Sequence, residues 1–98
     1  MANMVGGFTE TMDATEETQK FCDQVKCQVE EKTNEKYETF LAVKYRSQVV
    51  AGQIFLIKVH AGGYLLLKVL KKLSCNGGDI VLLDLQEDHG KDDPIVPF

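Results

Sequence analysis

Cys75 and the two histidines, His60 and His89, are the side chains of this sequence that could support nucleophilic catalysis. A cysteine thiolate attacks a substrate when a neighbouring histidine accepts its proton. No motif typical of a catalytic Cys/His pair surrounds these residues. A chain of 98 residues with no evident pocket is also a poor host for an active site. We therefore expect no catalytic residues, and we interpret Cys75 as a free, exposed thiol open to oxidation or intermolecular pairing.

The three cysteines predict neither a metal site nor an internal disulfide. Cys22 and Cys27 are five residues apart on an expected helix, so their side chains point in different directions. Their spacing is not CxxC and the histidines are distant, so the usual pattern of zinc ligands is absent. An odd number of cysteines fits reduced thiols in a cytosolic protein. We expect a cytoplasmic location and no metal or other cofactor.

The other candidate functional residues form the apolar run Gln48-Val49-Val50-Ala51-Gly52, which lies between two alternating apolar stretches. A hairpin should turn at this point. Most hairpin tips are polar, because loop backbone must stay solvated and exposed apolar groups gain nothing in an isolated monomer. A partner with a narrow cleft would bury these side chains. The alternative is that Val49 and Val50 pack against the end of a sheet.

The elements that must position this run are a helix and a set of strands. Apolar residues at helical spacing predict a helix from about Glu16 to Asn34, whose buried stripe is Phe21, Cys22, Val25, Val29 and Lys32. Asp13 or Thr15 would cap this helix, and Asp13 with Glu16 forms a weak capping box. Period-two alternation then predicts strands over Thr39–Gln48, Gln53–His60, Tyr64–Leu73 and Ile80–Gln86.

Glycine-containing turns connect the predicted strands at Ala51-Gly52, Gly62-Gly63 and Asn76-Gly77-Gly78. Short turns of this kind make an antiparallel meander. Its residues facing the helix would be Phe55, Ile57, Val59, Leu67, Val69 and Leu82. The fold class is therefore α+β, with one long helix packed on a four- to five-stranded antiparallel sheet. We expect a single domain over 1–98, in which 1–12 is a flexible amino-terminal arm able to add a short edge strand and 87–98 is an acidic tail.

Composition excludes several classes of function. A net charge of -4 argues against a nucleic-acid partner, which needs a basic patch. No stretch approaches the ~20 apolar residues that span a bilayer, so we expect no membrane partner. Residues 1–15 carry neither a basic segment nor an apolar core, so we expect no secretory signal peptide. Hydrophobic residues at 44% are ordinary for a globular domain.

Several short motifs occur together in a fixed order: Gly6-Gly7, Val29-Glu30-Glu31-Lys32, Ser47 to Gly52, Ile57-Lys58-Val59, Leu67-Lys68-Val69 and Lys91-Asp92-Asp93. With these motifs the chain resembles the stefins, or type 1 cystatins, of the cystatin superfamily of cysteine-protease inhibitors. The match covers nearly the whole chain. The resemblance implies a cystatin-like fold and reversible, tight-binding inhibition of papain-like cysteine proteases such as the cathepsins.

The resemblance also implies a wedge of three segments at one end of the sheet, which blocks the active-site cleft of the protease. The arm, with Met4, Val5, Gly6 and Gly7, would occupy the non-primed side. The first hairpin, with Gln48, Val49, Val50, Ala51 and Gly52, would plug the centre. The second hairpin, with Leu73, Ser74 and Cys75, would cover the primed side. Gly6 matches the position where a residue without a side chain lets the arm turn away from the protease cysteine.

The second hairpin departs from the common stefin pattern, because Ser74 stands where a proline usually follows the leucine. Without the fixed φ of proline this loop should lose more conformational entropy on binding, which leaves Leu73 as the expected contact. The alternative function is a cystatin-fold interaction or structural domain without inhibitory activity. We expect a monomer, with a domain-swapped or Cys75-linked dimer as the alternatives.

Overall fold

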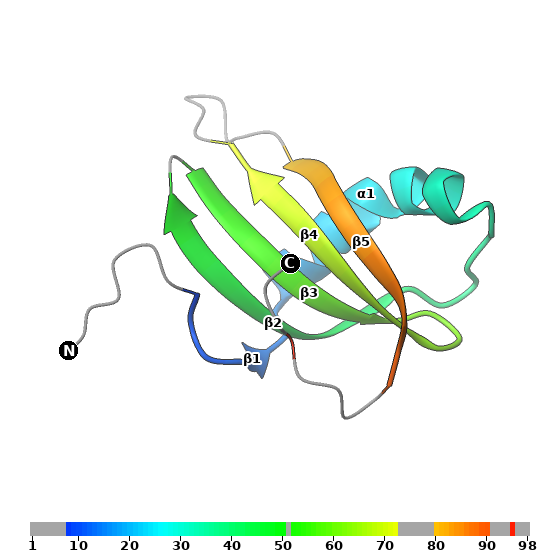
Figure 1. Cartoon of the computed structure of the whole chain (residues 1–98), viewed down its shortest axis with the longest axis horizontal. Helices are drawn as coiled ribbons and strands as arrows, with labels where there is room; N and C mark the ends of the chain where they lie inside the picture. Colours follow the sequence, from blue (N-terminus) through cyan, green and yellow to red (C-terminus); the bar gives the residue numbers. More distant parts are fainter. Residues whose placement is uncertain (1–7, 51, 73–79, 91–94, 96–98) are drawn as a thin grey trace.

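One helix packs across a five-stranded antiparallel sheet in the computed structural model (Figure 1). The structure describes residues 8–50, 52–72, 80–90 and 95. Along the chain the elements are β1 (Met12–Asp13), α1 (Glu16–Thr33), β2 (Leu41–Val50), β3 (Gly52–His60), β4 (Tyr64–Lys71) and β5 (Ile80–His89). The predicted α+β class is confirmed, and the short edge strand expected from the arm is β1.

The strands follow one another in the sheet in the order β1-β2-β3-β4-β5, and each pairs antiparallel with its neighbour. The predicted meander is therefore correct, but several strand ends are not. β2 runs from Leu41 to Val50, whereas the predicted strand was Thr39–Gln48. β4 ends at Lys71, whereas the predicted strand continued to Leu73. The fifth continues to His89, so residues 87–89 belong to the sheet and not to the predicted tail. Pairing with β4, which matches Tyr64 with His89, carries the strand that far.

Helix α1 begins at a threonine capping box, not at the predicted pair of Asp13 and Glu16. The N–H of Thr18 donates to Thr15 Oγ1 at 3.3 Å, and the N–H of Thr15 donates to Thr18 Oγ1 at 2.8 Å. Asp13 lies in β1, where its carboxylate accepts a hydrogen bond from Lys44. At the other end Asn34 adopts a left-handed conformation (φ 59°), which an asparagine tolerates and which ends the helix.

The core lies between α1 and the sheet. Four of the five predicted stripe residues are buried, namely Phe21, Cys22, Val25 and Val29, and so are all six residues predicted to face the helix. The rings of Phe21 and Phe55 meet with centroids 4.8 Å apart. The prediction for Lys32 is wrong, because its side chain is exposed in the last helical turn. Thr18 is 1% exposed and completes the stripe at the first turn, where its hydroxyl is satisfied by the capping box.

A second, smaller core lies on the face of the sheet that points away from α1. Leu56 and Leu66 are both buried there, although their neighbours Ile57 and Leu67 face the helix. Ile95, at 2% exposure, and Phe8 pack against them. The described part of the arm therefore contacts the sheet from Phe8 onward. The flexibility predicted for the arm as a whole stays a prediction.

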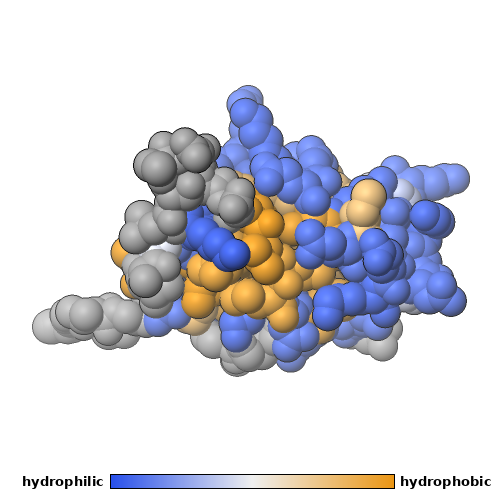
Figure 2. Space-filling model, turned by 90° about the horizontal axis from the view of Figure 1, so that it is seen from above, coloured by the Kyte–Doolittle hydropathy of each residue, from blue (hydrophilic) through white to orange (hydrophobic). Residues whose placement is uncertain are grey.

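Some large apolar side chains of the described chain remain in contact with solvent: Leu41 (54% exposed), Val49 (72%) and Leu83 (42%). On the face shown in Figure 2, apolar residues gather in one patch that hydrophilic side chains surround. Scattered exposed apolar residues are normal in soluble proteins. The position of each one in the fold decides whether it is of interest.

Candidate functional site

The first hairpin is a regular two-stranded ladder up to its tip. β2 and β3 pair from Leu41 and His60 at one end to Val50 and Gly52 at the other, with one irregularity near Val43. Gly52 has φ +113°, a backbone conformation that residues with a side chain rarely adopt. The predicted role of Gly52 in a tight reversal therefore has a structural basis. Gln48 pairs with Ile54 and is half-buried.

Val49 is the most exposed of the large apolar side chains in the described chain, at 72%. It pairs with Gln53 next to the tip of the hairpin. This exposure contradicts the alternative in which Val49 packs against the end of the sheet. An exposed valine near the end of a hairpin gains nothing for the isolated protein but becomes favourable when a partner covers it.

Of the other predicted site residues, the backbone of Val50 is described and forms the end of β2. The other predicted contacts, Met4, Val5, Gly6, Gly7, Ala51, Leu73, Ser74 and Cys75, lie outside the described residues.

The described residues that border those segments gather at one end of the sheet. Thr9 lies beside Ser47, since the Thr9 N–H donates to the Ser47 carbonyl at 2.8 Å. Lys71, the last residue of β4, pairs with both Gln53 and Ile80. Figure 1 shows the end of β2, the start of β3, the end of β4 and the start of β5 at the same end of the sheet. The described residues next to the predicted wedge segments therefore lie at the same end of the sheet.

The groups with clearly displaced pKa values in the described chain lie away from this end of the sheet. Burial, with a smaller effect of the Asp23 charge, raises the pKa of the Cys22 thiol to about 12. A hydrogen bond and the positive charge of Lys44 lower the pKa of Asp13. The Cys22 thiol is therefore protonated and inert at neutral pH. Cys27 is exposed.

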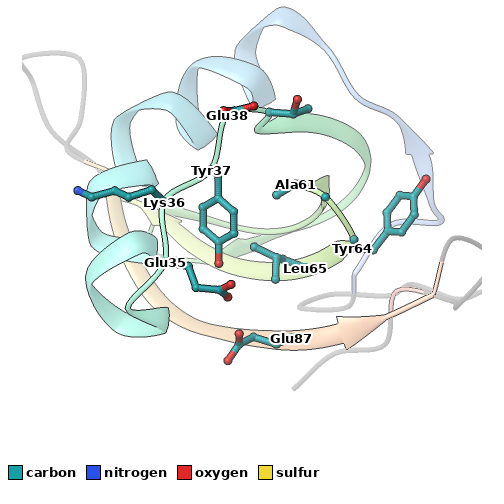
Figure 3. A pocket seen from close by; sticks show the side chains of 11 residues that line it. Glu35, Lys36, Tyr37, Glu38, Ala61, Tyr64, Leu65 and Glu87 are labelled. Carbon is teal, nitrogen blue, oxygen red and sulfur yellow. The ribbon is translucent and has the colours of Figure 1, made fainter.

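A groove of about 730 Å³ opens at the opposite end of the sheet, between the α1–β2 connection and the β3–β4 turn. Figure 3 shows the ring of Tyr37 pointing into it, while Lys36 points away. Its lining includes Glu35, Glu38 and Glu87, and none of the described side chains that line it is a cysteine, histidine or serine. Within the described ranges, no three histidine, cysteine or acidic side chains are placed to hold a metal ion. No helix among those residues is long and apolar enough to cross a membrane.

Sequence analysis missed the residues that attach the arm to the sheet, Phe8, Arg46 and Ile95. Arg46 donates hydrogen bonds to the carbonyls of both Thr9 and Ile95. The partners are main-chain atoms 37 and 49 residues away, so no local pattern marks the arginine. The continuous apolar runs at Phe55-Leu56-Ile57 and Leu65-Leu66-Leu67 were a usable signal, because strands buried on both faces read in this way.

The model of the cystatin domain matches residues 6–91, and the chain belongs to the cystatin family. Similar curated proteins span almost the whole chain. It is 50% identical to cystatin-A of Rattus norvegicus over 97% of this chain and 93% of that protein. It is 43% identical to cystatin-B of Oplegnathus fasciatus over the full length of both. It is 45% identical to leukocyte cysteine proteinase inhibitor 1 of Sus scrofa, over 97% of this chain and 94% of that protein.

Proposed function

We propose that this protein is a reversible, tight-binding inhibitor of papain-like cysteine proteases. Members of the cystatin family are protease inhibitors and not enzymes. The observation that carries the proposal for this chain is Val49, a 72% exposed valine near the end of a hairpin whose strands are paired up to Val50 and Gly52. An exposed apolar residue at the end of a hairpin suits insertion into a cleft and does not itself form a pocket for a small substrate.

The proposed mechanism is steric occlusion by three segments. The arm, with Met4, Val5, Gly6 and Gly7, occupies the non-primed side of the protease cleft. The first hairpin, residues 48–52, fills the centre, and Leu73, Ser74 and Cys75 cover the primed side. No peptide bond of the inhibitor lies in line with the protease nucleophile, so the complex forms without cleavage.

The first hairpin is well suited to provide affinity. Its strands are paired up to Val50 and Gly52, so the backbone is ordered before binding and loses little further entropy. Complete burial of a valine side chain stabilises by about 1.5–3 kcal/mol. An exposed, pre-ordered Val49 can therefore contribute at the level of an interface hot spot.

The proposal extends to the target proteases, the location of the inhibitor and its oligomeric state. Cathepsins are the expected targets, and a cytoplasmic inhibitor would act on enzyme that leaks from lysosomes. A monomer is the expected active form, because a wedge with all three segments needs no second copy. The alternative, a cystatin-fold domain without inhibitory activity, gains support from one feature only, Ser74 in place of the usual proline.

Titration of active papain with the purified protein tests the proposal. We expect residual activity to fall linearly to near zero at a 1:1 molar ratio, with the inhibitor recovered intact by mass spectrometry. Activity should return when the complex is diluted in the presence of excess substrate, since no covalent bond forms. Unchanged papain activity at a tenfold excess of the protein would favour the non-inhibitory domain. Progressive cleavage of the protein would show that it is a substrate.

A further inference from the structure

Arg46 connects two segments that are remote from it in sequence. Its Nε donates to the carbonyl of Thr9 at 2.7 Å, and its Nη1 donates to the carbonyl of Ile95 at 2.7 Å. A guanidinium has several donors in a fixed plane, so one side chain can bind two carbonyl groups at once. Through Arg46, the amino-terminal arm and the carboxy-terminal segment are attached to the same position of β2.

Other contacts at the same place reinforce this connection. The Thr9 N–H donates to the Ser47 carbonyl at 2.8 Å, and the Ser47 N–H donates to Thr9 Oγ1 at 3.2 Å. Phe8 packs on the outer cluster of Leu56, Leu66 and Ile95. Ile95 is 2% exposed, so the carboxy-terminal segment is held by burial as well as by Arg46. Attachment of the arm therefore begins at Phe8, directly after the Gly6-Gly7 pair.

We propose that Arg46 is a positioning residue for inhibition, which couples the carboxy-terminal segment to the arm and holds the arm beside the first hairpin. This inference rests on the proposed function, in which Met4–Gly7 contact the protease. Arg46 itself is not a contact residue in this scheme. Its effect is to reduce the conformational freedom that the arm would otherwise lose on binding.

The register of the arm gives this attachment a direction. Asp13 pairs with Lys44 and Met12 with Tyr45, while Thr9 lies beside Ser47. When the arm is followed backward from Asp13 to Thr9, it therefore runs along β2 in the direction of Val50. The described part of the arm, which Arg46 holds at Thr9, is therefore directed toward the end of the first hairpin.

The test combines variants with two measurements. Arg46→Met removes both hydrogen bonds and keeps the aliphatic stem, and Arg46→Lys keeps the charge but not the planar fork. Lys44→Met removes the same charge from the same strand, where only an exposed ion pair with Asp13 is lost. Each variant is also made without residues 1–6. The measurements are the rate constants for papain binding and the hydrogen-exchange rate of the Thr9 amide, with the Leu67 amide as a reference.

We expect Arg46→Met to raise the papain dissociation rate about tenfold, which corresponds to about 1.4 kcal/mol, with little change in the association rate. Thr9 exchange should accelerate by at least tenfold while Leu67 exchange stays unchanged. Arg46→Lys should be intermediate, and Lys44→Met should stay within about twofold of the wild type. Without residues 1–6, Arg46→Met should have no further effect on dissociation. A chain that ends at Gly90, and so lacks Ile95, should also lose Thr9 protection.

Two results would overturn this proposal alone. One is unchanged Thr9 exchange in Arg46→Met; the other is an equal rise in the dissociation rate with and without residues 1–6, since Arg46 would then act independently of the arm. A wild-type protein that does not inhibit papain would instead overturn the proposed function, and the positioning role together with it.

Discussion

Ser47 and Val49 lie on the same face of β2, one pleat apart, yet Ser47 is 6% exposed and Val49 is 72% exposed. Both have partners in β3, where Ser47 pairs with the buried Phe55 and Val49 pairs with Gln53. The covered core therefore ends between these two residues. Beyond this boundary β2 and β3 continue as a paired ladder, so the hairpin projects from the core without losing its backbone order.

A Val49→Asp variant should lose most inhibition and little stability. Aspartate at an exposed position is tolerated in the free protein, so we expect the melting temperature to change by no more than about 3 °C. In the complex the carboxylate would be buried without a partner, and papain affinity should fall about 100-fold or more. Inhibition kinetics and thermal unfolding of the same preparation measure both effects.

Leu41→Asp is the matched control for this variant. Leu41 is also an exposed apolar residue of β2, at 54%, but lies at the other end of the strand. Its inhibition constant should stay within about twofold of the wild type, because single exposed residues outside an interface contribute little. Equal losses of affinity in Leu41→Asp and Val49→Asp would argue against the hairpin tip as the contact surface.

Gly52→Ala should destabilise the protein, because Gly52 has φ +113°. A methyl group in this region costs about 1–3 kcal/mol, or a drop in melting temperature of at least about 4 °C for a domain of this size. Gly63→Ala is the control, since Gly63 has open space around its position and no positive φ. Its stability should change by less than about 1 kcal/mol. Equal melting temperatures for the two variants would contradict the backbone argument.

The described thiols should differ strongly in reactivity. Cys27 is exposed and should react with iodoacetamide within minutes at pH 8, whereas Cys22 is fully buried and should react only through opening of the fold, at least about 100-fold more slowly. Mass spectrometry of partly labelled protein measures both rates, and the unfolded protein provides the control. A Cys75→Ser variant tests whether Cys75 labels faster than Cys27. Fast native labelling of Cys22 would contradict its place in the core.

Alkaline pH should destabilise the protein through Cys22. The folded pKa is raised from 9.0 to about 12, so the thiol ionises in the unfolded chain before it ionises in the fold. The stability contributed by the neutral thiol is complete below pH 9 and is lost as the pH rises from 9 toward 12. Between pH 8 and pH 10 the loss is about 1 kcal/mol. Denaturant unfolding of wild type and Cys22→Ala checks this, because the variant should lack that part of the pH dependence.

Much of the fold was predictable because the helix and strands follow strong local patterns. The helix stripe from Phe21 to Val29 and the residues of β3 to β5 that face it repeat at the expected spacings. The pattern was ambiguous where a polar residue fits two positions. Lys32 continues the helical spacing, but its charge keeps it in solvent. Of the two predicted caps, Thr15 is the one that caps the helix, because Asp13 is already paired in β1.

The attachment of the arm was not predictable in the same way. Arg46 binds main-chain carbonyl groups, which every residue has, so its partners leave no trace in the sequence. Phe8 and Ile95 meet on the outer face only because β3 and β4 bring Leu56 and Leu66 together there. The exposure of Val49, in contrast, was anticipated from an apolar run at a predicted turn. The single sequence thus predicted the exposed position at the hairpin better than the residues that attach the arm.

Phe8 and Ile95 belong to the same apolar cluster on the outer face of the sheet. Two segments that lie close together can be joined by a short linker while new ends are opened elsewhere. The turn at Gly62 and Gly63, opposite the first hairpin, is a suitable place for the new ends. Such a circular permutant would keep the hairpin intact and convert the arm into a closed loop. It would show whether the arm needs a free amino end to enter a cleft.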